Sequence, residues 1–407
     1  METLQEKCIN VLSRNFYERP IACATSQLKP QLLQQIHERL NPDLDPFVLA
    51  RHVVSERYWR KRLEQQQQQQ QQQHASVLST AKSLALQAAL QQVIEADDAE
   101  KIERIELDVI VEHIFALRLT KVPLSIDLSK TLACLNNLTF LEIELGPDGM
   151  SDEEAMALGR ALPSVKYLTN LSMRNCCLSD DSIRAMKDGM KSSSTGSTSS
   201  RLPPGLISLD VSDNRISAGG LGLLFDMLSP YEEESSNTRS CVLSSFIAAN
   251  NCIDEEGGRF LATDVLPVCT SLTHLNVKVN QLGDVGGQMI LGALQEQTRK
   301  IGSSGESFQL QQVNLAGNGL ASKTAESLAQ LLRENDIASL SSINISLNNL
   351  SSENIASILS AIQGNAGRRG ASILHLDLQE SNSRLGETTG RIDVAKMERG
   401  CGVRVYL

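Results

Sequence analysis

One short pattern recurs along this 407-residue chain and constrains its fold more than any other feature. The stretch LISLDVSDNRI begins at position 206 and has its apolar anchors at Leu206, Leu209, Val211 and Ile216. Anchors at +3 and +5 alternate as in a short strand, so both point into one core. The chain then turns inward, where the amide of Asn214 at +8 can supply both a donor and an acceptor to unpaired backbone groups. We therefore interpret Asn214 as a structural residue.

The same spacing returns several times. Full matches begin at Leu243, Leu272, Leu310 and Leu340, and their amide residues are Asn251, Asn280, Asn318 and Asn348. A copy that begins at Leu168 has Cys176 in the amide position, and weaker copies begin at Ile114, Leu138 and Ile373. This is the L-x-x-L-x-L-x-x-N/C-x-L signature of a leucine-rich repeat.

A stretch with apolar residues at helical spacing follows each strand and turn. In SDEEAMALGRAL, for example, Ser151 and Glu154 are spaced as a capping box. A strand plus a full helix in each repeat predicts an α/β solenoid of the ribonuclease-inhibitor type, with parallel strands on the concave side and helices on the convex side.

Repeat starts are 24 to 38 residues apart, so most repeats exceed the ~20–29 residues usual for this motif. The additional residues lie between a helix end and the next strand, in KSSSTGSTSSRLPPG (191–205), SPYEEESSNTRS (229–240), QEQTRKIGSSGES (295–307) and QGNAGRRGAS (363–372). We expect all four to be flexible loops on one rim.

The remaining segments differ from the repeats. Residues 1–64 read as a cap of three or four short helices broken at Pro20, Pro30, Pro42 and Pro46, with Trp59 as the anchor of their core. A polyglutamine linker (65–73) and a helical linker (74–110) follow, the latter with one helix over roughly 76–100. The repeats then occupy 111–388. Residues 389–407 are expected to form a C-terminal cap that ends in a strand, VRVYL.

Composition argues against several classes of function. The net charge of −10 and a pI near 5.3 disfavour nucleic acid as a partner. The only basic clusters are RKR (60–62) and the GRRG stretch (367–370), which we interpret as solvated surface. Nine cysteines show no CxxC spacing, and neither a signal peptide nor a membrane span is visible. We therefore expect a soluble, intracellular chain with reduced thiols.

No chemistry converges on the predicted strands. Their outward positions are mostly small and neutral, and His274 and His375 belong to well-separated repeats. The glycine clusters GGLG (219–222) and GDVGG (283–287) lack a following Lys-Ser/Thr pair and are explained by close packing. We therefore expect no catalytic residue, cofactor or metal. As partner contacts we expect outward strand residues and the cap, namely Trp59, Arg174, Asp210, Asn276, Asn314 and Asn344.

The order of segments resembles one known family. NVLSRNFYERP, LKPQLLQQIHERL and SERYWRKR in the cap, then LTNLSMRNCCLSDDSI and LPPGLISLDVSDNRIS in the repeats, are similar to the T-complex-associated testis-expressed protein 1 family. Its ciliary member is a subunit of the nexin–dynein regulatory complex. The resemblance implies a non-catalytic scaffold in the axoneme of motile cilia. Its partners would be other subunits, including another leucine-rich repeat subunit, and indirectly doublet microtubules and dynein arms.

Two other functions stay open at this point. The repeats also resemble GTPase-activating proteins that serve the Ran GTPase, in which case Arg174 or Arg215 would face a small GTPase; a regulator of actin belongs to the same alternative. Those proteins have a long acidic C-terminal tail, which this chain lacks. A ubiquitin-ligase substrate receptor would require the N-terminal helices to form an adaptor of the F-box kind.

Overall fold

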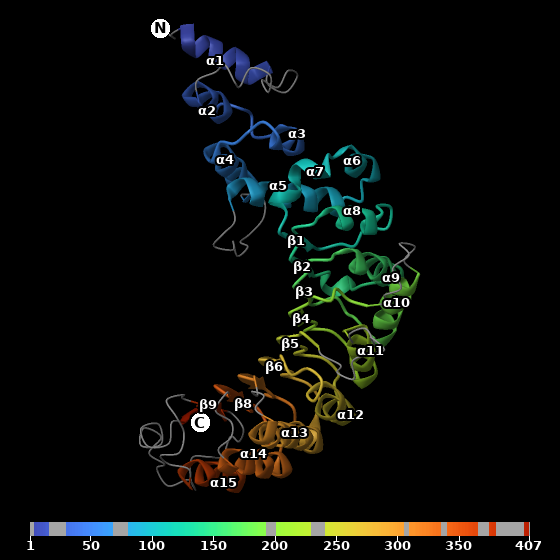
Figure 1. Cartoon of the computed structure of the whole chain (residues 1–407), viewed down its shortest axis with the longest axis vertical. Coiled ribbons are helices and arrows are strands. Elements are labelled where there is room, and N and C mark those ends of the chain that lie inside the picture. The colour runs from blue at the N-terminus through green and yellow to red at the C-terminus, as the bar shows by residue number, and fades with distance from the viewer. Residues whose placement is uncertain are drawn as a thin grey trace. The chain divides into compact units, whose positions relative to one another are not determined.

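The computed structural model describes residues 4–15, 30–67, 80–192, 201–228, 241–304, 309–334, 340–364, 374–379 and 403–406 (Figure 1). The chain divides into two compact units, Met1–Glu142 and Ile143–Leu407, and the boundary falls near the end of strand β2. The segment limits expected at residues 64, 73, 110 and 388 remain predictions.

The first unit is mostly helical. Its elements are α1 (Leu4–Asn15), α2 (Pro30–Glu38), α3 (Pro46–Ala50), α4 (Glu56–Gln67), α5 (Ala81–Glu95), α6 (Ala99–Arg104), α7 (Leu107–Ile110), β1 (Ala116–Leu119), α8 (Leu128–Cys134) and β2 (Phe140–Ile143). Pro30 and Pro46 are the first residues of their helices, where the absent N–H is not needed. The expected boundaries at Pro30 and Pro46 are therefore confirmed as helix starts, Pro42 lies between α2 and α3, and Pro20 lies outside the described residues.

Trp59 lies at the centre of this helical unit, as expected of an anchor. It is fully buried with Tyr58, and the two rings meet edge to face at 5.2 Å. Its indole Nε1 donates to the carbonyl of Val53 at 3.0 Å. Arg62 is buried as well and donates to the carbonyls of Pro42 and Leu44 at 2.5 and 2.6 Å. The RKR cluster therefore exposes two cations instead of three, and GRRG lies outside the described residues.

The single long helix expected over roughly 76–100 is wrong in its extent. Helix α5 begins after the N-cap Thr80 and ends at Glu95, because Asp97 takes a left-handed conformation with φ 54°. Its carboxylate accepts the backbone N–H groups of Leu124, Ser125 and Ile126. Although burial would raise the pKa of Asp97, these hydrogen bonds hold it below its ordinary value. A tertiary contact thus ends the helix where local propensity would continue it.

The second unit alternates strands and helices. Its strands are β3 (Asn170–Met173), β4 (Ser208–Asp210), β5 (Ser245–Ile247), β6 (His274–Asn276), β7 (Gln312–Asn314), β8 (Ser342–Asn344), β9 (Leu374–Asp377) and β10 (Val403–Tyr406). Its α-helices are α9 (Asp152–Ala161), α10 (Asp180–Lys191), α11 (Ala218–Leu228), α12 (Glu255–Phe260), α13 (Gly283–Ser304), α14 (Ser322–Glu334) and α15 (Ser352–Gly364). Figure 1 shows these strands stacked on the inner side of a curve and the helices on its outer side.

The strands of this unit pair in parallel and in chain order. Equivalent anchors face each other, as Leu209 faces Phe246 and Val313 faces Ile343. The anchors are buried, and β10 pairs in parallel with β9, so the expected closing strand is confirmed over Val403–Tyr406. The fold is the predicted α/β leucine-rich repeat solenoid.

The amide positions form a buried ladder that joins successive repeats. Asn214 shows the pattern: its Oδ1 accepts the N–H groups of Cys176 and Leu178, and its Nδ2 donates to the carbonyls of Met173 and Val211. Each amide therefore bonds both its own turn and that of the preceding repeat. The same kinds of bond are made by Asn251, Asn280, Asn318 and Asn348.

Cys176 fills the same position with a thiol. Its Sγ donates to the carbonyls of Ile143 at 3.2 Å and Arg174 at 3.1 Å. Burial raises the pKa of Cys176 to about 11, so it stays protonated as a hydrogen-bond donor. The structural roles expected for all six ladder positions agree with these contacts.

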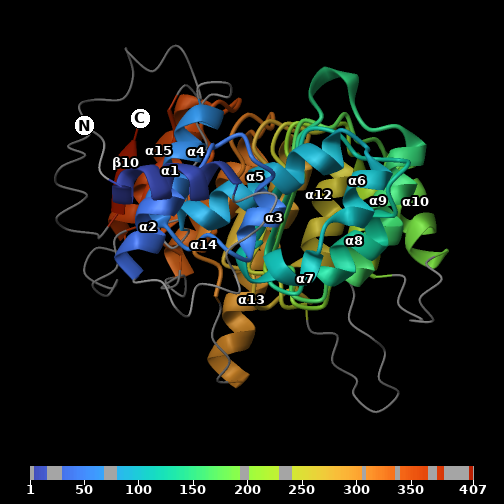
Figure 2. The ribbon, with the colours of Figure 1, turned by 90° about the horizontal axis from the view of Figure 1, so that it is seen from above.

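Helix capping agrees with the sequence, but one expected loop is wrong. Ser151 and Glu154 form the capping box at the start of α9. The segment 295–307, expected to be a rim loop, is instead helical as far as Ser304, and Figure 2 shows α13 extending beyond its neighbours. Gln, Glu, Arg and Lys are good helix formers and continue the helix. Residues 193–200, 229–240 and 365–373, which make up most of the other three expected loops, lie outside the described residues.

Candidate functional site: the strand face and the turns that follow it

Four of the expected partner contacts occupy the last position of a strand and are half-buried. They are Asp210, Asn276, Asn314 and Asn344. In each, the side-chain Oδ1 accepts the backbone N–H two residues later, at 2.9 to 3.1 Å. These side chains therefore shape the turn, a role that the spacing of the core anchors did not reveal. Among the described residues, no hydrogen bond engages the Nδ2 groups of the three asparagines.

Arg174 belongs to a small polar network at the strand ends. Its Nη2 lies 2.9 Å from Oδ2 of Asp213 and its Nε lies 3.9 Å from Oδ2 of Asp210. The Nδ2 of Asn250 donates to the other oxygen of Asp213 at 3.0 Å. The hydrogen bond between Arg174 and Asp213 raises the pKa of the arginine and lowers that of the aspartate. The structure thus brings Arg174 and Asp210 together, across neighbouring strands.

A row of left-handed residues follows the strands, one before each ladder position. Its members in chain order are Asn175, Asp213, Asn250, Val279, Gly317 and Leu347, with φ between 51° and 65°. Asn, Asp and Gly tolerate this conformation, but Val and Leu rarely adopt it. Val279 and Leu347 are nevertheless exposed, at 41% and 46%. The row is therefore polar in the earlier repeats and partly apolar in the later ones.

Replacing Val279 with Asn is expected to raise the free energy of unfolding by about 1 kcal/mol, because a β-branched residue is strained in the left-handed region. Asn occupies the equivalent position 250. Urea denaturation followed by circular dichroism measures the change. Val242→Asn is the control, because Val242 is similarly exposed, at 48%, but is not left-handed. Equal effects of the two substitutions would contradict the strain at Val279.

Chemistry on the strand face is limited in the part of the chain that the structure describes. His375 stacks on Tyr406 with its Nδ1 3.2 Å from the hydroxyl, and His274 contacts Thr273. No group of three or more His, Cys, Asp or Glu side chains is placed to hold a metal among those residues. Nor does any helix described there have the length and apolar character needed to cross a bilayer.

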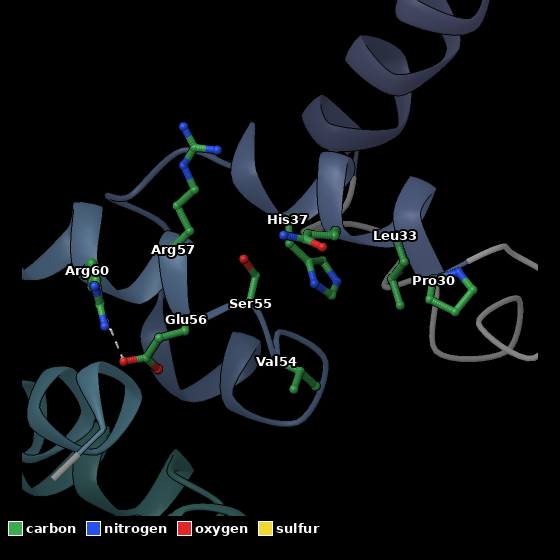
Figure 3. A pocket seen from close by; sticks show the side chains of 9 residues that line it. Pro30, Leu33, His37, Val54, Ser55, Glu56, Arg57 and Arg60 are labelled. Carbon is green, nitrogen blue, oxygen red and sulfur yellow. Dashed lines mark ion pairs between the residues drawn. The ribbon is translucent and has the colours of Figure 1, made fainter.

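The helical unit carries a hollow of about 780 Å³ beside α2 and the start of α4 (Figure 3). Its wall includes Leu33, His37 and Val54, and Val54 is 79% exposed. Arg57 and Arg60 lie at its edge, and Arg60 is 3.8 Å from Glu56. Burial, and then the nearby His52, lower the pKa of His37 to about 4, so it is neutral near pH 7. An apolar hollow with cations at its edge is suited to recognition.

Trp59 itself is not placed to contact a partner. Its side chain is fully buried, because it fills the core of the helical unit. The side chain of Trp59 is therefore excluded as a direct contact, and a contact through the cap around it remains a prediction.

The comparison with protein families supports the leucine-rich repeat and nothing finer. A family model described as a leucine-rich repeat matches residues 268–291, and no curated protein matches the chain. A solved structure of a protein from Bacteroides fragilis is 11% identical, covers 79% of this chain and 82% of its own, and has a TM-score of 0.39. The structure of human 5T4 (trophoblast glycoprotein) is 17% identical, and the match covers 64% of this chain and 74% of that one, with a TM-score of 0.34. A chain of the mouse RP105/MD-1 complex is 17% identical, and the match covers 65% of this chain and 38% of that one, with a TM-score of 0.32.

Proposed function

We propose that this leucine-rich repeat protein is a non-catalytic scaffold, and that its partners bind the strand face and the turns that follow it. A solenoid offers one extended surface to which each repeat adds a few contacts. The proposal rests on the four residues that end their strands, Asp210, Asn276, Asn314 and Asn344. Each accepts the backbone N–H two residues later, and this repeated hydrogen bond holds the four side chains in one orientation. A surface organised in this way is suited to binding a protein rather than to catalysing a reaction.

We further propose that the scaffold works in the axoneme of motile cilia, as a subunit of the nexin–dynein regulatory complex. The support is the resemblance of the cap sequence SERYWRKR and of the repeat block to the T-complex-associated testis-expressed protein 1 family. Within the cap, the side chains of Tyr58, Trp59 and Arg62 form the core. The motif therefore stabilises the helices whose surface carries the apolar hollow.

The double variant Asp210→Lys with Asn314→Arg is expected to reduce recovery of complex subunits in a pull-down from ciliated cells at least about tenfold, because it places two cations on the proposed interface. Asp210→Asn is the matched control, since an amide keeps the acceptor for the N–H of Ser212. Glu326→Lys adds a cation on the exposed side of α14 and should leave recovery unchanged. Full recovery with a folded double variant would reject the strand face as the interface.

Location and activity separate this proposal from the small-GTPase alternative. Tagged protein should lie along motile cilia, and purified protein should leave the rate of GTP hydrolysis by Ran unchanged. Acceleration of that hydrolysis, lost in Arg174→Ala, would favour the alternative instead.

A further inference from the structure

We propose that Cys241 and Cys269 form a thiol–disulfide exchange site, which reacts with a low-molecular-weight disulfide such as oxidised glutathione and closes into a disulfide between consecutive repeats. The site lies on the helix side of the second unit, away from the proposed interface.

Repeat geometry brings the two cysteines together. Cys241 lies two residues before the anchor Leu243, and Cys269 lies three residues before the anchor Leu272. The strands that follow, β5 and β6, are hydrogen-bonded neighbours. Equivalent loops of consecutive repeats therefore stack, so both cysteines line one cavity and their thiols interact.

A cavity of about 470 Å³ gives small molecules a place beside these thiols. Both cysteines line it, together with Phe225 of α11 and with Phe260 and Thr263 of the following repeat. The cysteines are only 6% and 4% exposed, so the cavity is the route by which a reagent reaches them. Its two carboxylates are engaged, since Asp226 pairs with Lys187 and Asp264 accepts from the hydroxyl of Thr263.

The wall of this cavity has an irregular backbone. Helix α12 ends at Phe260, and the chain continues as a π-helical turn, Leu261–Val265. Such turns are rare and occur frequently at functional sites. The carbonyl of Val265 at the end of this turn accepts the N–H of Cys269, which fixes the cysteine at the edge of the cavity.

A hydrogen bond between the two thiols makes their acidities unequal. Cys269 donates its S–H, which lowers the pKa of Cys241 to about 7 and raises that of Cys269. A thiol with a pKa near the ambient pH is well suited to attack a disulfide. Cys176 is the contrasting case in the same unit, because its thiol donates to carbonyls and burial raises its pKa to about 11.

The reaction balances in two exchanges. The Cys241 thiolate attacks one sulfur of oxidised glutathione, a mixed disulfide forms, and one glutathione thiolate leaves. Cys269 then loses its proton to that thiolate and attacks the Cys241 sulfur, which releases the second glutathione. Two protein thiols are oxidised, and one glutathione disulfide is reduced to two thiols.

The test treats the reduced full-length chain with oxidised glutathione and, separately, with the uncharged hydroxyethyl disulfide, followed by alkylation and peptide mapping. Because the exposed Cys252 is close to Cys241 in sequence, a Cys252→Ser background is used. We expect a Cys241–Cys269 disulfide that retains no glutathione. In Cys269→Ser, the hydroxyl still donates a hydrogen bond, and the mixed disulfide should persist on Cys241. In Cys241→Ser, Cys269 should react at least about tenfold more slowly.

Cys176 supplies the internal reference for a buried, unreactive thiol. The proposal is overturned if Cys241 reacts with both reagents no faster than Cys176 in the folded protein, or if Cys269→Ser leaves no adduct on Cys241.

Discussion

Replacing Asn348 with Ala is expected to lower the free energy of unfolding by about 3 kcal/mol, because it leaves several buried backbone groups without partners at about 1–3 kcal/mol each. Its Oδ1 accepts the N–H groups of Asn318 and Leu320, at 2.8 and 3.0 Å. Its Nδ2 donates to three carbonyls, of which the shortest bond, 2.8 Å, is to Ile345. The side chain is only 4% exposed, so water cannot replace these bonds.

The adjacent Asn349 offers a matched control. It is exposed, and its backbone N–H bonds Leu320 whatever side chain it carries. Asn349→Ala should therefore change the free energy of unfolding by no more than about 0.5 kcal/mol. Urea denaturation followed by circular dichroism compares the two variants. Equal stabilities would show that the amide ladder does not support the repeats.

Replacing Gly159 with Ala is expected to lower the free energy of unfolding by about 3 kcal/mol, at the upper end of the usual effect of overpacking. A Cβ at this position would lie 2.0 Å from the carbonyl oxygen of Met186 in the next helix, where backbone cannot yield as a flexible side chain would. Gly189 lies reciprocally against the carbonyl of Met156, at 2.2 Å. Helices α9 and α10 therefore approach each other through two glycines.

The control for this crossing is Gly292→Ala in helix α13. A Cβ there would have no heavy atom within 4 Å, so the variant should gain about 0.5–1 kcal/mol from the higher helix propensity of Ala. Thermal and urea unfolding measure both variants. If Gly159→Ala proved as stable as Gly292→Ala, the close approach of α9 and α10 would be refuted.

Much of the fold could be predicted because the same core positions recur in every copy of the repeat. The strand anchors and the amide positions of the second unit were placed correctly, including Cys176, since each depends on spacing within about ten residues. The three weaker copies, which begin at Ile114, Leu138 and Ile373, also form strands, namely β1, β2 and β9. The packing explanation of the glycine clusters holds for some of their members. A Cβ at Gly220 would lie 2.4 Å from Asp180 and one at Gly287 2.5 Å from Leu320, whereas Gly222 has open space around it.

The surface that partners would use could be predicted only in part. Asp210, Asn276, Asn314 and Asn344 were placed outward from the strand phase, but their bonds to the turn were missed. A short polar residue at the strand end, two residues before the turn, is the signal that would have found them. The left-handed conformations of Val279 and Leu347 gave no signal, since neither residue type favours that conformation.

Sequence alone therefore determined the repeat, its core side chains and its amide positions, because these depend on the periodicity of one strand and one helix. Only the tertiary structure decided which contacts join elements about thirty residues or more apart. Asp97 ends α5 by accepting N–H groups at 124–126, and Asp284 of α13 accepts the N–H groups of Ala321 and Thr324 at the start of α14. The placement of Cys241 and Cys269 at one cavity is of the same kind. Such contacts depend on how successive repeats stack, and no local spacing records that geometry.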